Sequence, residues 1–154
     1  MAKYVKGNDA VISIWDADAE AWRPIGCETS HTLTENQEVE EGEGTKCDPN
    51  PSRSLGAYTY SVDADAKMIH SDDENYSDKA NYEFLRERFK GQREDSEEIE
   101  WRLTGADYDQ FGKGYITDLS RTGAFGDDAE FSLSIEGIGE IEETDPHYNE
   151  NNAE

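Results

Sequence analysis

A long alternation of apolar and polar residues over 56–69, GAYTYSVDADAKMI, limits the fold more than any other feature of the chain. Tyr, Val, Ala and Met occupy every second position, and Thr, Ser, Asp and Lys stand between them. Successive side chains of a β-strand point to opposite faces, so the pattern predicts one long strand with a buried face and a wet face. Strands of this kind are typical of antiparallel sheets that cover a core on one side only.

Shorter segments with the same alternation predict five further strands. They span 8–15, 22–34, 97–105, 111–120 and 129–143. Helical spacing occurs over 78–90, where Tyr82, Leu85 and Phe89 would form a buried stripe and Ser77 would cap the first turn. The chain is therefore expected to be mainly β: an antiparallel β-sandwich or barrel with one flanking α-helix.

One segment shows neither the alternation of a strand nor the spacing of a helix: ENQEVEEGEGTKCDPNPSRS at 35–54. Glycines and prolines break it, and most of its other residues are polar or charged. Roughly 20 residues without structure are unusual inside a compact domain, and such segments are commonly functional or become ordered by a partner. The sequence therefore predicts a long extended arm or loop between two strands.

Acidic residues outnumber basic residues 37 to 14, which gives a net charge of -23. Such a chain repels nucleic acid, because binding requires cations that neutralise phosphates. The acidity fits a surface that must not adhere to a polyanion, and it also fits adaptation to molar salt, where charge repulsion is screened within about 3 Å. The acids are spread over every segment, which favours a hypersaline source as a hypothesis.

The stretch WDADAEAWRPIGC places Asp16, Asp18 and Glu20 on alternate positions, like the start of a calcium loop. Ala21 and Cys27 stand where such a loop needs glycine and glutamate. A hairpin turn with a tryptophan on each side is therefore favoured over a cation site. The glycines of FGKGYI and EGIGEI lack the ending of a phosphate loop, and a catalytic-serine motif is absent. We expect no enzyme, no metal and no cofactor.

The two cysteines, Cys27 and Cys47, are too few for a disulfide framework and lack zinc spacing, so we expect reduced thiols. An apolar run of about 18 residues is also absent, so no membrane span is expected. The first ten residues, MAKYVKGNDA, lack an apolar signal region. Synthesis in a cytoplasm, including that of an infected cell, is therefore expected.

Several segments together resemble the major tail protein family, the tail tube proteins of phages with long non-contractile tails. They are KGNDAVISIWD, WRPIGCETSHTLTENQEVEE, GTKCDP, IEWRLTG and FGKGYITDLSRTGAFGDDAEFSLSIEGIGEIEETDP. In the last segment the positions of the family pattern are held by Gly114, Leu119, Ser120, Gly126, Asp127, Gly137 and Gly139. The resemblance covers roughly 5–146.

This resemblance implies a single tail tube domain over 1–146, with the arm at 35–54, the helix at 78–90 and a polar tail at 147–154. It implies hexameric rings that stack into a hollow virion tail tube around a tape-measure protein and later conduct double-stranded DNA. Tail terminator and distal tail or baseplate proteins are the other implied partners. An acidic lumen would repel the DNA, so that it slides.

The family's long loop after the second strand contacts the neighbouring ring, which here implies a self-assembly site within 37–55. The candidate residues are Gln37, Glu38, Val39, Glu40, Lys46, Cys47, Asp48, Pro49, Pro51 and Arg53. Two alternatives stay open. One is the tube protein of a contractile or type VI-like injection system. The other is a calcium-dependent adhesion or carbohydrate-binding β-sandwich that uses the DADAE segment and the tryptophans.

Overall fold

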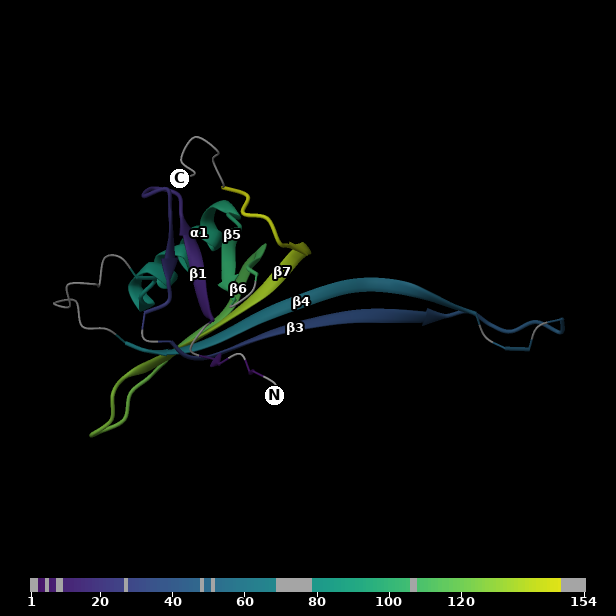
Figure 1. Ribbon diagram of the computed structural model, residues 1–154, viewed down its shortest axis with the longest axis horizontal. Helices are drawn as coiled ribbons and strands as arrows, with labels where there is room; N and C mark the ends of the chain where they lie inside the picture. The colour runs from purple at the N-terminus through teal and green to yellow at the C-terminus, as the bar shows by residue number, and fades with distance from the viewer. Residues whose placement is uncertain are drawn as a thin grey trace.

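The computed structural model describes residues 3–4, 6–7, 10–26, 28–47, 49–50, 52–68, 79–105 and 108–147. Within these residues the elements follow the order β1 (Val11–Asp16), β2 (Ala21–Pro24), β3 (Glu28–Glu41), β4 (Arg53–Lys67), α1 (Tyr82–Asp95), β5 (Ile99–Thr104), β6 (Gln110–Thr122) and β7 (Glu130–Glu142) (Figure 1). The predicted class is confirmed: the described chain is mainly β, its strands are antiparallel, and one helix flanks them. This helix is not long and apolar enough to cross a membrane.

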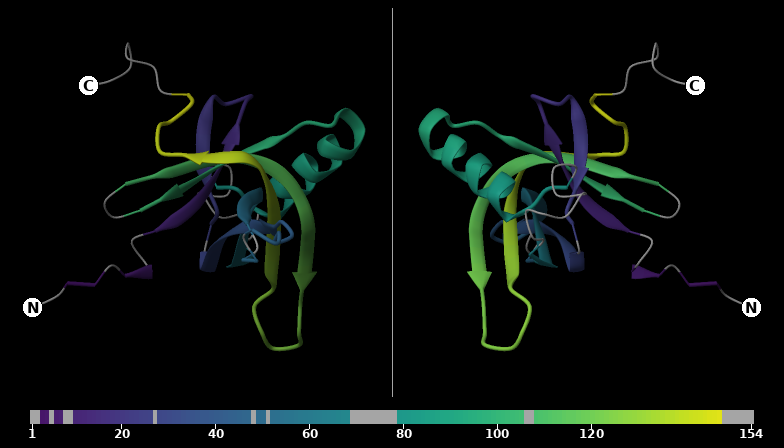
Figure 2. Two further views of the ribbon diagram at one scale, coloured as in Figure 1. Left: turned by 90° about the vertical axis from the view of Figure 1, so that its right-hand side faces the viewer. Right: turned by 90° about the vertical axis from the view of Figure 1, so that its left-hand side faces the viewer.

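The strands form one continuous sheet in the order β2-β1-β5-β6-β7-β4-β3. End-on views show β6 and β7 curving strongly, so that the sheet folds over itself (Figure 2). The two halves meet where the edge of the Tyr60 ring on β4 contacts Trp101 on β5, with ring centroids 5.7 Å apart. The sandwich-like core is thus made by one bent sheet and closed by the helix.

A side chain of α1 takes the place of a missing strand beside β6. β5 pairs with β6 only as far as Ile99↔Gly114. Two residues further on, the side-chain amide of Gln92 on α1 bonds β6: its Nε2 donates to the Ile116 carbonyl at 2.8 Å, and its Oε1 accepts from the Ile116 N–H at 2.6 Å. The helix therefore continues the hydrogen bonding of the sheet where β5 ends.

Tyr60 joins the bent part of the sheet to the core. Its hydroxyl donates to the Lys113 carbonyl at 2.7 Å and accepts from the Lys113 N–H at 3.2 Å. A Cβ atom at Gly137 would overlap the Tyr60 ring, and one at Gly112 would overlap its hydroxyl and the Trp101 ring. Gly112 and Gly137 are thus required by close packing, which is a role that glycine within a strand pattern predicts.

The buried residues agree with the alternation in the sequence. Tyr60, Val62, Ala64 and Ala66 of β4 face the core, as do Phe131, Leu133 and Ile135 of β7. On the helix, Leu85 is fully buried, and Tyr82 and Phe89 pack against the core as the predicted stripe requires.

The predicted helix bounds of 78–90 are wrong at both ends, because α1 spans Tyr82–Asp95. The helix begins late because the Asn81 side chain accepts a hydrogen bond from the Phe84 N–H at 3.0 Å and caps the first turn. It continues past Gly91 until Ser96 adopts a left-handed conformation with φ of 56°. The predicted cap, Ser77, lies outside the described residues.

Two strand predictions also need correction. The strand predicted over 22–34 is two strands, because β2 ends at Pro24, which has no N–H to donate, and β3 begins at Glu28. The arm predicted over 35–54 is largely a hairpin: β3 runs to Glu41 and β4 starts at Arg53. Both faces of that hairpin are wet, so the ribbon shows no apolar period in the sequence.

Candidate assembly surfaces

The β3–β4 hairpin projects far beyond the body of the molecule (Figure 1). From here on, the arm means the outer part of this hairpin, 35–57, which is slightly longer than the predicted 35–54. Residues 35–41 of β3 are all exposed. Because an isolated two-stranded ribbon is marginally stable in water, an arm of this length is suited to contact with another surface.

Polar side chains hold the two strands of the arm in register. Gln37 Nε2 donates to the Gly56 carbonyl at 3.0 Å, and Arg53 Nε contacts Glu41 Oε1 at 3.0 Å. Nearer the body, the Tyr58 hydroxyl donates to Glu35 Oε1 at 2.7 Å. Desolvation of the phenol and this hydrogen bond to a carboxylate raise the pKa of Tyr58 to about 12. The arm therefore has a defined shape and is not a structureless loop.

One apolar pair interrupts the charged surface of the arm. Val39 and Leu55 face each other across the strands, and their exposed fractions are 57% and 75%. They lie among glutamates, since Glu38 and Glu40 flank Val39 on β3. We call Val39 and Leu55 the arm pair. Such a pair gains most by being covered when a second surface lies against it.

The structure places most of the predicted site residues along this hairpin. Gln37, Glu38, Val39 and Glu40 are on β3, Arg53 opens β4, and Lys46, Cys47 and Pro49 lie in the connection between the strands. The Cys47 thiol is exposed and free. Asp48, Pro51 and Cys27 lie outside the described residues. The sequence alone did not identify Leu55 as the partner of Val39, because only strand register reveals it.

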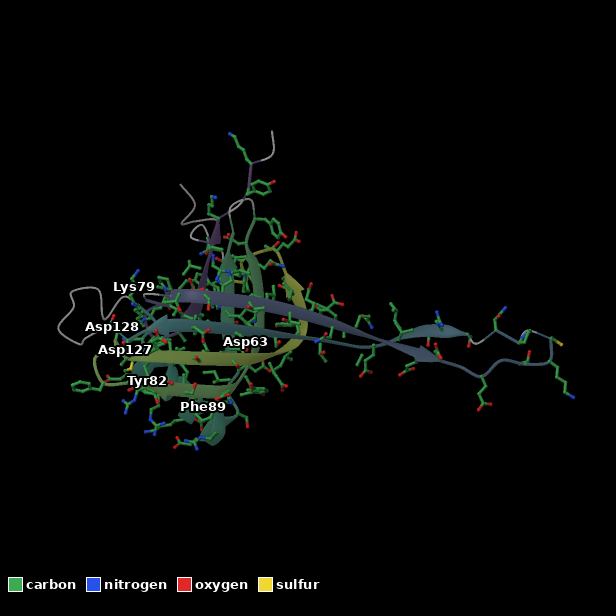
Figure 3. All side chains as sticks on the ribbon, turned by 90° about the horizontal axis from the view of Figure 1, so that it is seen from below. Asp63, Lys79, Tyr82, Phe89, Asp127 and Asp128 are labelled. Carbon is green, nitrogen blue, oxygen red and sulfur yellow. The ribbon has the colours of Figure 1, made fainter. Side chains whose placement is uncertain are left out.

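A second surface is the polar face of β3, β4, β7 and β6, which lie side by side in Figure 3. Two carboxylates on β4 are held by hydroxyls of β7. Ser134 Oγ donates to Asp63 Oδ1 at 2.6 Å, and Ser132 Oγ donates to Asp65 Oδ1 at 2.5 Å. Ser30 of β3 donates to the other oxygen of Asp65 at 3.1 Å. These bonds order two negative charges on a hydroxyl-rich face.

The acids of the DADAE segment have different environments. Asp16 is buried; its carboxylate lies 2.7 Å from the Arg23 guanidinium and 3.2 Å from that of Arg88. Asp18 and Glu20 are exposed in the turn between β1 and β2. Within the described part of the chain, no group of three or more His, Cys, Asp or Glu residues is arranged to hold a metal ion. Asp16 is thus committed to an ion-pair cluster.

The predicted hairpin turn is present, and the tryptophans on its two sides pair with each other. Trp15 and Trp22 are register partners, and their rings meet edge to face with centroids 5.2 Å apart. His147 stacks on Trp15 at a centroid distance of 3.6 Å. The rings therefore pack on one another and on the end of the described chain, which leaves them less suited to a sugar platform.

Sequence comparison finds no matching protein-family model and no matching curated protein. Solved structures, in contrast, match over most of the chain. A chain of the native gene transfer agent virion is 18% identical, with a TM-score of 0.64 over 91% of this chain and 98% of its own. A chain of the tail of an empty gene transfer agent particle, refined with C6 symmetry, is 17% identical, with a TM-score of 0.66 over the same shares, 91% and 98%.

The SPP1 tail tube subunit is 13% identical, with a TM-score of 0.62 over 88% of this chain and 77% of its own. These identities are low, but the alignments cover 88–91% of this chain. The resemblance inferred from the sequence is confirmed at the level of the fold. The chain therefore has the fold of the phage tail tube proteins.

Proposed function

We propose that this protein is the major subunit of a virion tail tube, a structural protein without catalytic activity. The observation that carries the proposal is a likeness that extends over nearly all of both chains, 91% of this one and 98% of a gene transfer agent tail chain. The C6 symmetry of that tail supports hexameric rings here. Stacked rings form a hollow tube for the passage of double-stranded DNA, and the protein resides in the virion after synthesis in the host cytoplasm.

The arm contacts the neighbouring ring in this proposal. Its residues 35–41 extend from the body with no cover from the rest of the described chain, and the arm pair lies within it. Stacking would bury this ribbon and bring a second surface against its apolar side chains. The candidate residues on β3 and at Arg53 belong to this contact.

The polar face that carries Asp63 and Asp65 lines the lumen. Asp63 and Asp65 are held by hydroxyls and present fixed negative charge, and Lys67, the cation on the same face of β4, is paired with Asp128 at 3.3 Å. Ring symmetry repeats each carboxylate around the lumen, which would keep DNA from adhering to the wall. The remaining proposed partners are a tape-measure protein, a tail terminator and distal tail or baseplate proteins.

A second candidate is the tube protein of an injection system. A chain of the anti-feeding prophage baseplate matches with a TM-score of 0.58 over 92% of this chain and 96% of its own, at 6% identity. The two candidates share ring stacking and differ in what passes through the tube. A lumen wall of fixed carboxylates suits a polyanionic cargo, which favours the DNA-conducting tail.

Negative-stain electron microscopy of the purified protein in molar KCl without added metal tests the proposal. Rings or tubes are expected. Deletion of Gln37–Ser52 should leave a folded protein with the melting behaviour of the body but without stacked rings. A protein that stays monomeric at high concentration in molar salt would contradict the proposal, and calcium binding by calorimetry would favour the adhesion alternative.

A further inference from the structure

The turn between β6 and β7 presents one aromatic side chain to solvent. The Asp127 N–H donates to the Ala124 carbonyl at 3.1 Å, which closes a four-residue turn, and Gly126 adopts the left-handed conformation with φ of +86°. Phe125 stands within this turn and is fully exposed, at 107% of its reference surface. The turn fixes the backbone on both sides of the ring, so binding would order few groups that are free in the monomer.

This turn and the arm lie at opposite ends of the same sheet. β4 pairs with β7 so that Lys67 lies opposite Glu130, next to the turn, whereas the other end of β4, at Arg53, belongs to the arm. Figure 3 shows the arrangement: Asp127 and Asp128 are at one end of the strands and the arm leaves the other. A subunit with different exposed apolar side chains at its two ends is suited to head-to-tail contacts between copies.

Both ends of the subunit present exposed apolar side chains. Phe125 offers an exposed apolar ring, and the arm pair, Val39 and Leu55, offers exposed aliphatic side chains. Charge does not favour the contact, because Asp128 already pairs with Lys67 at 3.3 Å and Arg53 with Glu41 at 3.0 Å within one subunit, so the contact rests on its apolar side chains. Single exposed apolar residues are common on monomers, but one at each projecting end of an elongated subunit is the arrangement that a heterologous contact requires.

We propose that Phe125 of one copy packs against the arm pair, Val39 and Leu55, of another copy of this chain. The inference rests on the proposed function and deepens it, because it names the surface that receives the arm. Phe125 acts as the buried anchor of the contact, and the charged residues around it form a wet rim. The glutamates of the arm repel the acidic turn, so the contact forms only when salt screens them.

The first experiment compares Phe125→Ser with the wild-type protein. We expect unchanged melting, because the side chain is exposed, and an increase of about 30-fold in the protein concentration needed for half-maximal ring stacking, the effect of losing an interface anchor. Tyr108→Ser is the matched control: its ring is 60% exposed but lies between β5 and β6. The control should stack like the wild-type protein.

The second experiment is a disulfide trap between two singly substituted proteins in a Cys47→Ser background. Mixing Phe125→Cys with Leu55→Cys should yield a covalent dimer under stacking conditions, and mixing Tyr108→Cys with Leu55→Cys should not. The Cys47→Ser parent measures any background from Cys27. Only contacts between copies can join these pairs, so the trap reports the proposed contact directly.

The outcomes separate this inference from the tube proposal. If the wild-type protein forms no rings or tubes, both are overturned together. If it stacks, and Phe125→Ser stacks at the same concentration without a dimer from the Phe125→Cys and Leu55→Cys mixture, only this inference fails. Loss of stacking in Phe125→Ser together with the specific dimer supports both.

Discussion

Replacement of Tyr60 by phenylalanine tests how the bend of the sheet is held. The substitution keeps the ring that packs on Gly112 and Gly137 and removes only the hydroxyl. That hydroxyl bonds both the carbonyl and the N–H of Lys113, and Tyr60 is only 2% exposed. Water therefore has little access to replace the lost partner.

The expected cost follows from the two hydrogen bonds. A buried polar group that loses its partner costs about 1–3 kcal/mol, so two such groups on Lys113 predict a loss of about 2–6 kcal/mol in the free energy of unfolding. In a domain of this size each kcal/mol lowers the melting temperature by about 2–4 °C. Tyr60→Phe should therefore melt about 4–24 °C below the wild-type protein.

Urea unfolding followed by tryptophan fluorescence is the assay, because Trp101 touches the Tyr60 ring and reports the site directly. Tyr115→Phe is the matched control: its hydroxyl reaches the Ser96 carbonyl at 3.5 Å in an exposed position. The control should change the free energy of unfolding by less than about 0.5 kcal/mol. A Tyr60→Phe protein as stable as this control would refute the role given to the hydroxyl.

Four further predictions concern stability. Gly137→Ala should cost more than about 3 kcal/mol in urea unfolding, because its Cβ would overlap an aromatic ring; a cost under about 1 kcal/mol would contradict the packing. Asp16→Asn should lower the free energy of unfolding by about 2–3 kcal/mol, because it leaves the guanidinium groups of Arg23 and Arg88 without their buried carboxylate. An unchanged urea midpoint would argue against this ion-pair cluster. Burial raises the pKa of Glu28 above 4.5, so the folded state holds this proton more tightly than the unfolded state does. The wild-type fold therefore loses stability as pH rises from 4.5 through the folded-state pKa of Glu28. Glu28→Gln cannot titrate, so its melting temperature relative to wild type should improve across that pH range in a series of melting curves. Under the hypersaline hypothesis the melting temperature should rise steeply between about 0.1 M and 2 M KCl, and a flat calorimetric profile would count against it.

The strands and the helix stripe could be predicted because burial is periodic in them. On β4, Val62, Ala64 and Ala66 alternate with wet residues, and the helix places Leu85 between two aromatic residues of the same face. The outer strands of the arm could not be predicted in this way. Between Glu35 and Glu41 every residue is exposed, so strand pairing there leaves no apolar period in the sequence.

Contacts between distant segments also could not be predicted from the sequence. Gln92 looks like an ordinary helical glutamine, and only the end of β5 beside Ile116 gives its amide a role in the sheet. The arm was predicted as an assembly site by resemblance, but the pairing of Val39 with Leu55 depends on register. Phe125 lies between the strands predicted over 111–120 and 129–143, and its proposed role follows from the position of its turn opposite the arm.

The continuity of β4 has a mechanical consequence. The strand that forms one edge of the arm runs on into the body, where it pairs with β7 from Ser61 to Lys67. Hydrogen bonds in an antiparallel ladder lie perpendicular to the strands, so a pull on the arm along its length loads these bonds in shear, all at once. Tension passed from one subunit to the next would therefore be shared across the sheet and would not unzip it bond by bond.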